Sequence, residues 1–165
     1  MSEIAKAREI LNFWFQGVDD STVINKKAPP FSQWFTKDPS FDQQIKDRFE
    51  EDLKNAASHE PVWGTTPRGS LALVILCDQF SRNIYRDIPK MYDTDPQALS
   101  LSVKLIKGKE DQRLSMIERV FVYLPFMHAE DMGMQRESVQ LFKNLVMDSK
   151  HQAPYNVNYF ENNLF

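Results

Sequence analysis

The stretch that decides the fold is residues 66–83, TPRGSLALVILCDQFSRN. Thr66 and Pro67 form a helix start, because a Thr side chain can cap free backbone N–H groups and proline suits the first turn. From Leu71 to Cys77 every residue is apolar, so the helix is predicted to lie in the centre of the molecule. It ends in four polar residues that can bind a ligand or move a proton: Asp78, Gln79, Arg82 and Asn83.

These four residues are a candidate ligand-binding cluster. Asp78 and Arg82 are four residues apart, as are Gln79 and Asn83, so each pair lies side by side on an α-helix. Two simpler interpretations stay open: a surface ion pair, and a buried polar network that ties helices together. We favour a site, because the cluster follows directly on a helix that is predicted to be buried.

Helices, and no strands, are predicted in the rest of the chain. Apolar residues recur at helical spacing in residues 3–15, 39–53 and 132–147. Short loops between helices favour antiparallel hairpins, in one domain of residues 1–165 with about six to seven helices. The apolar stripes are Ile4, Ala7, Leu11 and Trp14; Phe41, Ile45, Phe49 and Leu53; and Val139, Phe142 and Leu145.

Several short motifs mark where these helices begin and end. Asp38-Pro39 and Asp95-Pro96 repeat the pattern of a capping residue followed by proline, and residues 115–118 (SMIE) form a capping box. Pro125 is expected to kink or break the helix that begins there. A last helix begins near Pro154.

Composition excludes several classes of function. The net charge is −3, with 20 basic and 23 acidic residues well mixed, so nucleic acid is not an expected partner. No apolar run approaches the roughly 20 residues of a membrane span, and the charged N-terminus does not resemble a signal peptide. Cys77 is the single cysteine, so it is expected to be a small buried residue. We expect a cytoplasmic protein.

A second candidate cluster is His128-Ala-Glu130-Asp131, which follows Pro125. Histidine is the side-chain type suited to proton transfer near neutral pH, so His128 is the candidate general base, with Glu130 or Asp131 as the group that orients it. We predict no metal and no cofactor, although a carboxylate-rich metal site using Asp78 and Glu130 stays open. The sequence lacks the Pro-Cys-x-x-Cys motif of a zinc deaminase.

Four arginines can recognise an anion: Arg68, Arg82, Arg86 and Arg136. The guanidinium group suits carboxylate or phosphate, which it binds with two parallel hydrogen bonds. For Arg86, a plain role on the surface is favoured. The expected ligand is a small anionic molecule or a peptide.

Several segments carry a family resemblance: residues 10–15 (ILNFWF), 34–35 (WF), 66–86, 95–99 (DPQAL), 118–126 and 128–131 (HAED). On these segments the chain resembles the bacterial domain-of-unknown-function family 924. The resemblance implies an all-α, tetratricopeptide-repeat-like right-handed array, and it supplies no activity. It also implies that family members continue past this C-terminus.

The C-terminal segment places Val157, Phe160 and Leu164 on one helical face, and the chain stops at Phe165. Such an ending leaves an apolar surface uncovered. We therefore expect that the native protein continues further or that a partner chain packs there, as in a homo-oligomer.

Two functions are compared. The favoured one is a module that binds a ligand or peptide in a polar pocket around Asp78, Arg82 and His128. The alternative is a hydrolase-like enzyme with His128 as general base, and it requires His128 to lie within hydrogen-bond reach of Asp78 or Arg82. The ligand-binding candidates are Arg68, Asp78, Gln79, Arg82, Asn83, His128 and Glu130, and the catalytic candidates are His128, Glu130 and Asp131.

Overall fold

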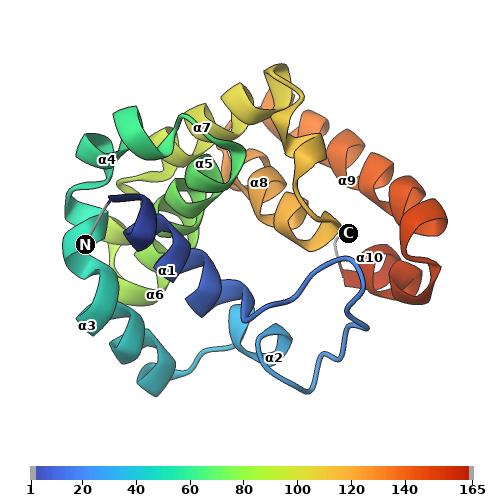
Figure 1. Cartoon of the computed structure of the whole chain (residues 1–165). Helices are drawn as coiled ribbons and strands as arrows, with labels where there is room; N and C mark the ends of the chain where they lie inside the picture. Colours follow the sequence, from blue (N-terminus) through green and yellow to red (C-terminus); the bar gives the residue numbers. More distant parts are fainter. Residues whose placement is uncertain (1–2, 164–165) are drawn as a thin grey trace.

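The structure, a computed structural model, describes residues 3–163 (Figure 1). The described part of the chain is helical and contains no strand, which confirms the expected all-α class. The α-helices are α1 (Glu3–Phe15), α2 (Phe31–Trp34), α3 (Pro39–Lys54), α4 (Ala56–Trp63), α5 (Pro67–Val74), α6 (Ser81–Ile84), α7 (Asp95–Lys107), α8 (Met116–His128), α9 (Met132–Gln152) and α10 (Val157–Asn163). The shorter elements are the π-helical turn η1 (Ile75–Phe80) and the 3-10 turns η2 (Pro89–Tyr92), η3 (Glu110–Arg113) and η4 (Pro154–Asn156).

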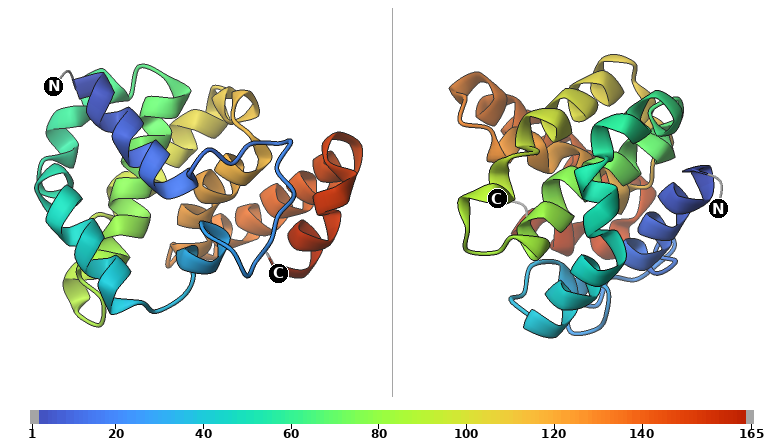
Figure 2. Two further views of the ribbon diagram at one scale, coloured as in Figure 1. Left: turned by 60° about the horizontal axis from the view of Figure 1, so that its bottom comes forward. Right: turned by 90° about the vertical axis from the view of Figure 1, so that its left-hand side faces the viewer.

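The centre of the molecule is the continuous helical segment formed by α5, η1 and α6. Every residue from Leu71 to Ser81 is buried, as its apolar composition predicts. Helices α1, α3, α4, α7 and α8 all contact this segment, and Figure 2 shows it enclosed by them. The buried apolar side chains form one cluster around it.

Gly69 permits the close packing at the start of this central segment. A Cβ atom at this position would lie 2.0 Å from the carbonyl oxygen of Trp63, the last residue of α4. The Gly69 N–H also donates to the capping hydroxyl of Thr66 at 3.0 Å. The glycine therefore lets α5 begin directly against the end of α4.

The middle of the central segment is a π-helix, whereas a single α-helix was expected. The Ser81 N–H donates to the carbonyl of Leu76, five residues earlier, which is the π-helical pattern. Side chains bind two of the carbonyls in this turn. Cys77 O accepts from the hydroxyls of Ser81 at 2.7 Å and Thr94 at 2.6 Å, and Asp78 O accepts from Arg82 Nη1 at 2.7 Å.

Three of the predicted helix caps are confirmed, and the fourth is wrong although its helix, α7, begins where it was expected. The side chains of Asp38, Thr66 and Ser115 cap α3, α5 and α8. Asp95 does not cap α7, because it is the first residue of that helix and its carboxylate binds Arg82 instead. A bidentate pair of hydrogen bonds between a carboxylate and a charged guanidinium group is stronger than a single capping bond to a backbone N–H.

Other sequence expectations also need correction. Pro125 does not break α8, which continues to His128; a proline near the end of a helix removes only one backbone hydrogen bond. Helix α4 was not predicted, and the described residues contain more helices than the six to seven expected. Ile4 and Val139 are exposed although they lie in the predicted stripes.

No helix in residues 3–163 has the length and apolar character needed to cross a membrane. Leu164 and Phe165, on which the expectation about the C-terminus rests, lie outside the described residues. The single domain and the tetratricopeptide-like handedness remain predictions.

Candidate functional site

The structure brings His128 and Asp78 into contact. His128 is the last residue of α8, and Asp78 lies in the π-helical turn η1, fifty residues earlier. The Nδ1 atom of His128 lies 2.8 Å from Oδ1 of Asp78. The Asp78 side chain is only 1% exposed and that of His128 is 25% exposed, so a buried carboxylate holds a histidine that reaches the surface.

Asp78 has partners on both carboxylate oxygens. Gln79 Nε2 donates to Oδ2 at 2.8 Å, and Arg82 Nη1 lies 3.5 Å from Oδ1. A carboxylate only accepts hydrogen bonds, so Nδ1 of His128 carries a hydrogen, and in the neutral imidazole Nε2 is an acceptor. Nε2 has no hydrogen-bond partner within residues 3–163.

Arg82 joins the central segment to the start of α7. Its Nη1 and Nη2 donate to the two carboxylate oxygens of Asp95 at 2.8 and 3.0 Å, and its weaker contact is with Asp78. Burial opposes the charged form of Arg82, but the hydrogen bond to Asp95 and the charge of Asp78 outweigh it, so the pKa of Arg82 is raised. The predicted ion pair of Arg82 with Asp78 is therefore weaker than the pair of Arg82 with Asp95, which is thirteen residues away in the sequence.

A cavity of about 600 Å³ lies in front of His128. Asp78 and Arg82 do not line it; they stand behind His128 and Asp95. The exposed Glu130 stands at its surface. The lining residues are Tyr92, Asp95, Pro96, Leu99, Pro125, His128, Ala129, Glu130 and Asp131.

Asp131 and Glu130 do not orient His128, which was one role expected for them. The Asp131 carboxylate caps α9 and accepts from the Met134 N–H at 2.8 Å. The group that orients His128 is Asp78, from a different helix. The hydrolase-like alternative required a contact of His128 with Asp78 or Arg82, and the structure has the contact with Asp78. The predicted burial of Asp78 also indicated that this carboxylate needs a partner.

Arg68 and Asn83 belong to other parts of the molecule. Arg68 lies at the opposite end of the central segment and pairs with Glu118 of α8. Asn83 Nδ2 donates to Asp42 of α3 at 2.8 Å, and Arg86 binds the same carboxylate at 2.6 and 2.9 Å. The structure therefore does not bring these three residues to the cavity.

Three of the four arginines considered as anion receptors are already engaged, whereas Arg136 is exposed on α9, has no ion pair among residues 3–163 and does not line this cavity. Arg68, Arg82 and Arg86 each pair with a carboxylate of the protein. Tyr92, Pro96 and Leu99 also line the cavity. Their sequence spacing does not predict this, because it is like that of ordinary surface positions.

Neither Cys77 nor a cluster of possible metal ligands adds a further candidate site among the described residues. Cys77 is buried, and burial raises the pKa of its thiol to about 12, so it is not a nucleophile. Among the described residues, no three His, Cys, Asp or Glu side chains come together as possible metal ligands.

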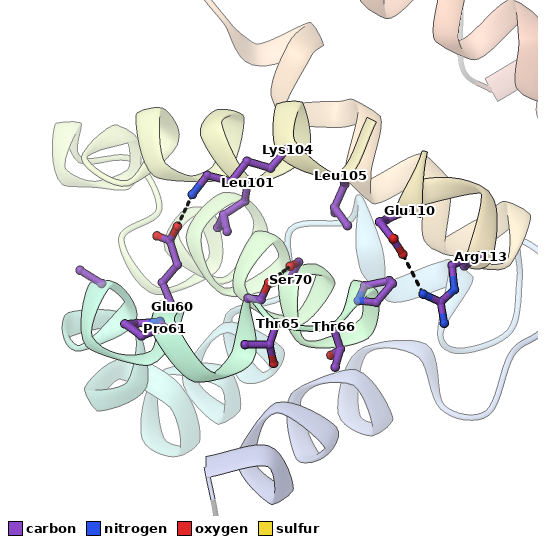
Figure 3. Close-up of a pocket in the computed structure, with 13 residues that line it drawn as sticks. Glu60, Pro61, Thr65, Thr66, Ser70, Leu101, Lys104, Leu105, Glu110 and Arg113 are labelled. Atoms are coloured by element: carbon purple, nitrogen blue, oxygen red, sulfur yellow. Dashed lines mark hydrogen bonds and ion pairs between the residues drawn. The ribbon is translucent and has the colours of Figure 1, made fainter. Parts of the chain in front are cut away.

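Another cavity, of about 520 Å³, lies between α4, α5 and α7 (Figure 3). Its charged side chains are paired with one another, Glu60 with Lys104 at 2.6 Å and Glu110 with Arg113 at 2.9 Å. The hydroxyl of Thr65 donates to a backbone carbonyl at 2.7 Å. The cavity beside His128 is the stronger candidate, because its histidine keeps an unused ring nitrogen.

Comparisons with known proteins agree with the fold. The model of a family described as "Bacterial protein of unknown function (DUF924)" matches residues 10–164. Among solved structures, the chain is similar to the protein of unknown function ATU0120 from Agrobacterium tumefaciens. That match has 37% sequence identity and a TM-score of 0.75, and it covers 98% of this chain and 85% of the other. No curated protein matches the chain.

Proposed function

The chain belongs to the DUF924 family of bacterial proteins, and from its geometry we propose a module that binds a small amine-bearing ligand in the cavity beside His128. The observation that carries the proposal is the 2.8 Å contact between His128 Nδ1 and the buried Asp78 carboxylate. This contact leaves Nε2 as a hydrogen-bond acceptor on a residue that lines a cavity of about 600 Å³.

The charge of the lining favours an amine over the anion that the arginines suggested. Asp95, Glu130 and Asp131 line the cavity, and no Lys or Arg does. Arg82 offsets the charge of Asp95 from behind, while Glu130 has no ion-pair partner among the residues described. An ammonium group would donate to His128 Nε2 and be stabilised by Glu130.

The apolar part of the lining supports a ligand with a hydrocarbon body. Pro96, Leu99 and Pro125 form this part, and the ring of Tyr92 lies beside them. A pocket with an apolar wall and a few placed polar groups is the usual form of a small-molecule site.

The test uses two probes of opposite charge, benzylamine and benzoate. We expect benzylamine to shift the ring resonances of His128 in an NMR titration and benzoate to leave them unchanged. The chain has only three histidines, so loss of a signal in His128→Asn assigns His128.

Two variants separate the roles of the two ring nitrogens. His128→Asn keeps a donor near the position of Nδ1 and removes Nε2, so it should fold normally and lose benzylamine binding. His128→Gln keeps a polar atom near the position of Nε2 and loses the bond to Asp78, so it should be destabilised. Binding of benzoate rather than benzylamine, or benzylamine binding that survives in His128→Asn, would overturn the proposal.

A second candidate is an enzyme in which His128 is the general base. A histidine held by a buried carboxylate is the arrangement that activates hydroxyl nucleophiles or water in hydrolases. Its test is hydrolysis of p-nitrophenyl acetate, which should be at least about tenfold faster for the native chain than for His128→Asn or Asp78→Asn. Equal rates in all three proteins would remove this candidate.

We also propose that the protein is cytoplasmic and that its helices form a tetratricopeptide-like array. The first proposal is supported by the low cysteine content, since the single cysteine, Cys77, is buried and has no second cysteine with which to form an internal disulfide. The close packing of the successive helices α8 and α9 supports the second.

A further inference from the structure

A second polar cluster lies away from His128, where α8, α9 and η3 meet. Arg119 Nε donates to the hydroxyl of Tyr123 at 3.0 Å, and that hydroxyl donates to Asp111 at 2.6 Å. Arg119 Nη2 donates to Asp148 Oδ2 at 2.8 Å. The cluster therefore links three elements, with Arg119 bound to α9 and Tyr123 bound to η3.

Burial fixes the direction of these hydrogen bonds. Arg119 and Asp111 are each 3% exposed and Tyr123 is 1% exposed. Burial raises the pKa of Tyr123, so its hydroxyl keeps the proton that it donates to Asp111. Arg119 is consequently held in one orientation by Tyr123 and Asp148.

The cluster borders a cavity of about 440 Å³. Its polar lining includes Asp111, Gln112, Arg119, Tyr123, Asn144 and Asp148, together with Lys109. None of these residues lines the cavity beside His128. The two cavities are therefore separate sites.

Three charged atoms at this cavity have no partner within residues 3–163: Nη1 of Arg119, Oδ1 of Asp148 and Nζ of Lys109. Lys109 has a left-handed backbone with φ of 54°, which is uncommon for a residue other than glycine. Such strained positions occur at ligand sites more often than elsewhere.

The charges and the apolar wall describe a particular kind of ligand. The cations Arg119 and Lys109 balance the anions Asp111 and Asp148, so a ligand with a net charge would disturb this balance. A ligand with one group of each sign would use both the spare donors and the spare acceptor. Ile106, Leu141 and Met147 also line the cavity and offer it apolar surface.

We propose that this cavity binds a free α-amino acid with an aliphatic side chain. The carboxylate lies between Arg119 Nη1 and Lys109 Nζ, because guanidinium and ammonium groups both donate to a carboxylate. The ammonium group donates to Asp148 Oδ1. The side chain packs on the apolar wall formed by Ile106, Leu141 and Met147.

The test compares three probes with the same side chain by calorimetry and NMR: leucine, N-acetyl-leucine and leucinamide. N-acetyl-leucine lacks the ammonium group, and leucinamide lacks the carboxylate. We expect leucine to bind at least about tenfold more tightly than either analogue. We also expect it to shift the NMR signal of the Arg119 Nε–H group, whose hydrogen bond to Tyr123 slows exchange with solvent.

Two variants test the assigned contacts without removing the buried arginine. Lys109→Gly removes the ammonium group and suits the positive φ, so leucine should bind several-fold more weakly with no loss of thermal stability. Asp148→Asn keeps an acceptor for Arg119 but loses the charge, so its preference for leucine over N-acetyl-leucine should disappear. Lys46→Gln, an exposed change on α3 outside the cavity, is the control and should bind leucine as the native chain does.

Several outcomes would overturn the proposal. N-acetyl-leucine binding as tightly as leucine would make this a simple carboxylate site, and equal binding of leucinamide would remove the role of Arg119 and Lys109. Absence of leucine binding at about 10 mM, a concentration that detects even weak sites, would also reject it.

Discussion

Arg82 shows how one side chain can be polar, partly buried and yet outside a ligand's reach. It binds both oxygens of Asp95 and the carbonyl of Asp78, and it stands behind the lining of the His128 cavity. The sequence placed it among the ligand-binding candidates because of its spacing from Asp78. Its contacts instead support a positioning role, in which Arg82 holds the turn that carries Asp78 against α7.

Replacing Arg82 with alanine should therefore affect stability more than binding. Arg82→Ala leaves the Asp95 carboxylate unpaired and should lower the free energy of unfolding by about 2–3 kcal/mol, measured by urea denaturation. Benzylamine should still shift the signals of His128. Arg113→Ala, which removes an exposed pair with Glu110, is the control and should cost less than about 0.5 kcal/mol. Lost benzylamine binding with unchanged stability would instead make Arg82 a ligand contact.

Gly69 is a second residue whose replacement is expected to lower the stability of the protein clearly. In Gly69→Ala the new Cβ would lie 2.0 Å from the Trp63 carbonyl oxygen, a backbone atom that cannot move aside cheaply. We expect a loss of about 3 kcal/mol in the free energy of unfolding, measured by urea denaturation. Gly108→Ala is the matched control, because its nearest atoms would lie at 3.4 Å; an equal loss in both variants would contradict the packing argument.

The start of a helix depends on a capping residue, and the local sequence predicted most of these caps correctly. The caps Asp38, Thr66 and Ser115 bind the backbone N–H groups that their motifs predict, because a cap involves residues only two or three positions apart. The failure at Asp95 has a tertiary cause, since Arg82 of another helix takes its carboxylate. The π-helical turn at residues 75–80 was also not predicted from the sequence, because an α-helix fits the same apolar pattern.

Removing the cap of the central segment should have a moderate effect. Thr66→Ala deletes the oxygen that accepts from Gly69 N–H and should lower the midpoint of thermal unfolding, with a loss of about 1 kcal/mol. Thr65→Ala, at the neighbouring exposed position, should cost less than about 0.5 kcal/mol. If both variants melt alike, the cap at Thr66 contributes no stability.

Across the molecule, exposed ion pairs join helices that are distant in sequence. Glu9 of α1 binds Arg48 of α3, and Glu60 of α4 binds Lys104 of α7. The hydrogen bond from Arg48 lowers the pKa of Glu9, and the hydrogen bond from Lys104 lowers the pKa of Glu60. Both carboxylates are therefore harder to protonate in the folded protein than in the unfolded chain.

This difference predicts how stability changes with pH. A pKa that is lower in the folded state contributes stability above the unfolded value of 4.5, and the contribution is lost as pH falls through the folded value. We expect the urea midpoint of Lys104→Met to fall less between pH 6 and pH 3 than that of the native chain. Lys143→Met, an exposed change without this pair, should follow the native chain. An equal fall in Lys104→Met would show that the pair with Glu60 adds nothing.

Within the candidate site, the sequence predicted one pocket around His128 and Asp78, and the hydrolase-like alternative required a contact of His128 with Asp78 or Arg82, but Asp78 was not predicted to orient His128. The orienting role was assigned to Glu130 or Asp131, which are close in sequence, whereas the partner comes from fifty residues away. Tyr92 and Leu99 line the cavity beside His128, although no motif in the sequence around them predicts this. The same holds for Arg119 and Asp148, which meet across α8 and α9.

The sequence by itself determined the helical class, most of the helix starts and the central burial of residues 71–77. These properties follow from spacing and capping within a few residues, where chain connectivity already sets which groups meet. Only the tertiary structure decided that Asp78 holds His128, that Arg82 binds Asp95 and that the cavity beside His128 is separate from the cavity beside Arg119. These contacts depend on how helices pack, and a charged or polar side chain that becomes buried must pair with whatever group the packing brings to it.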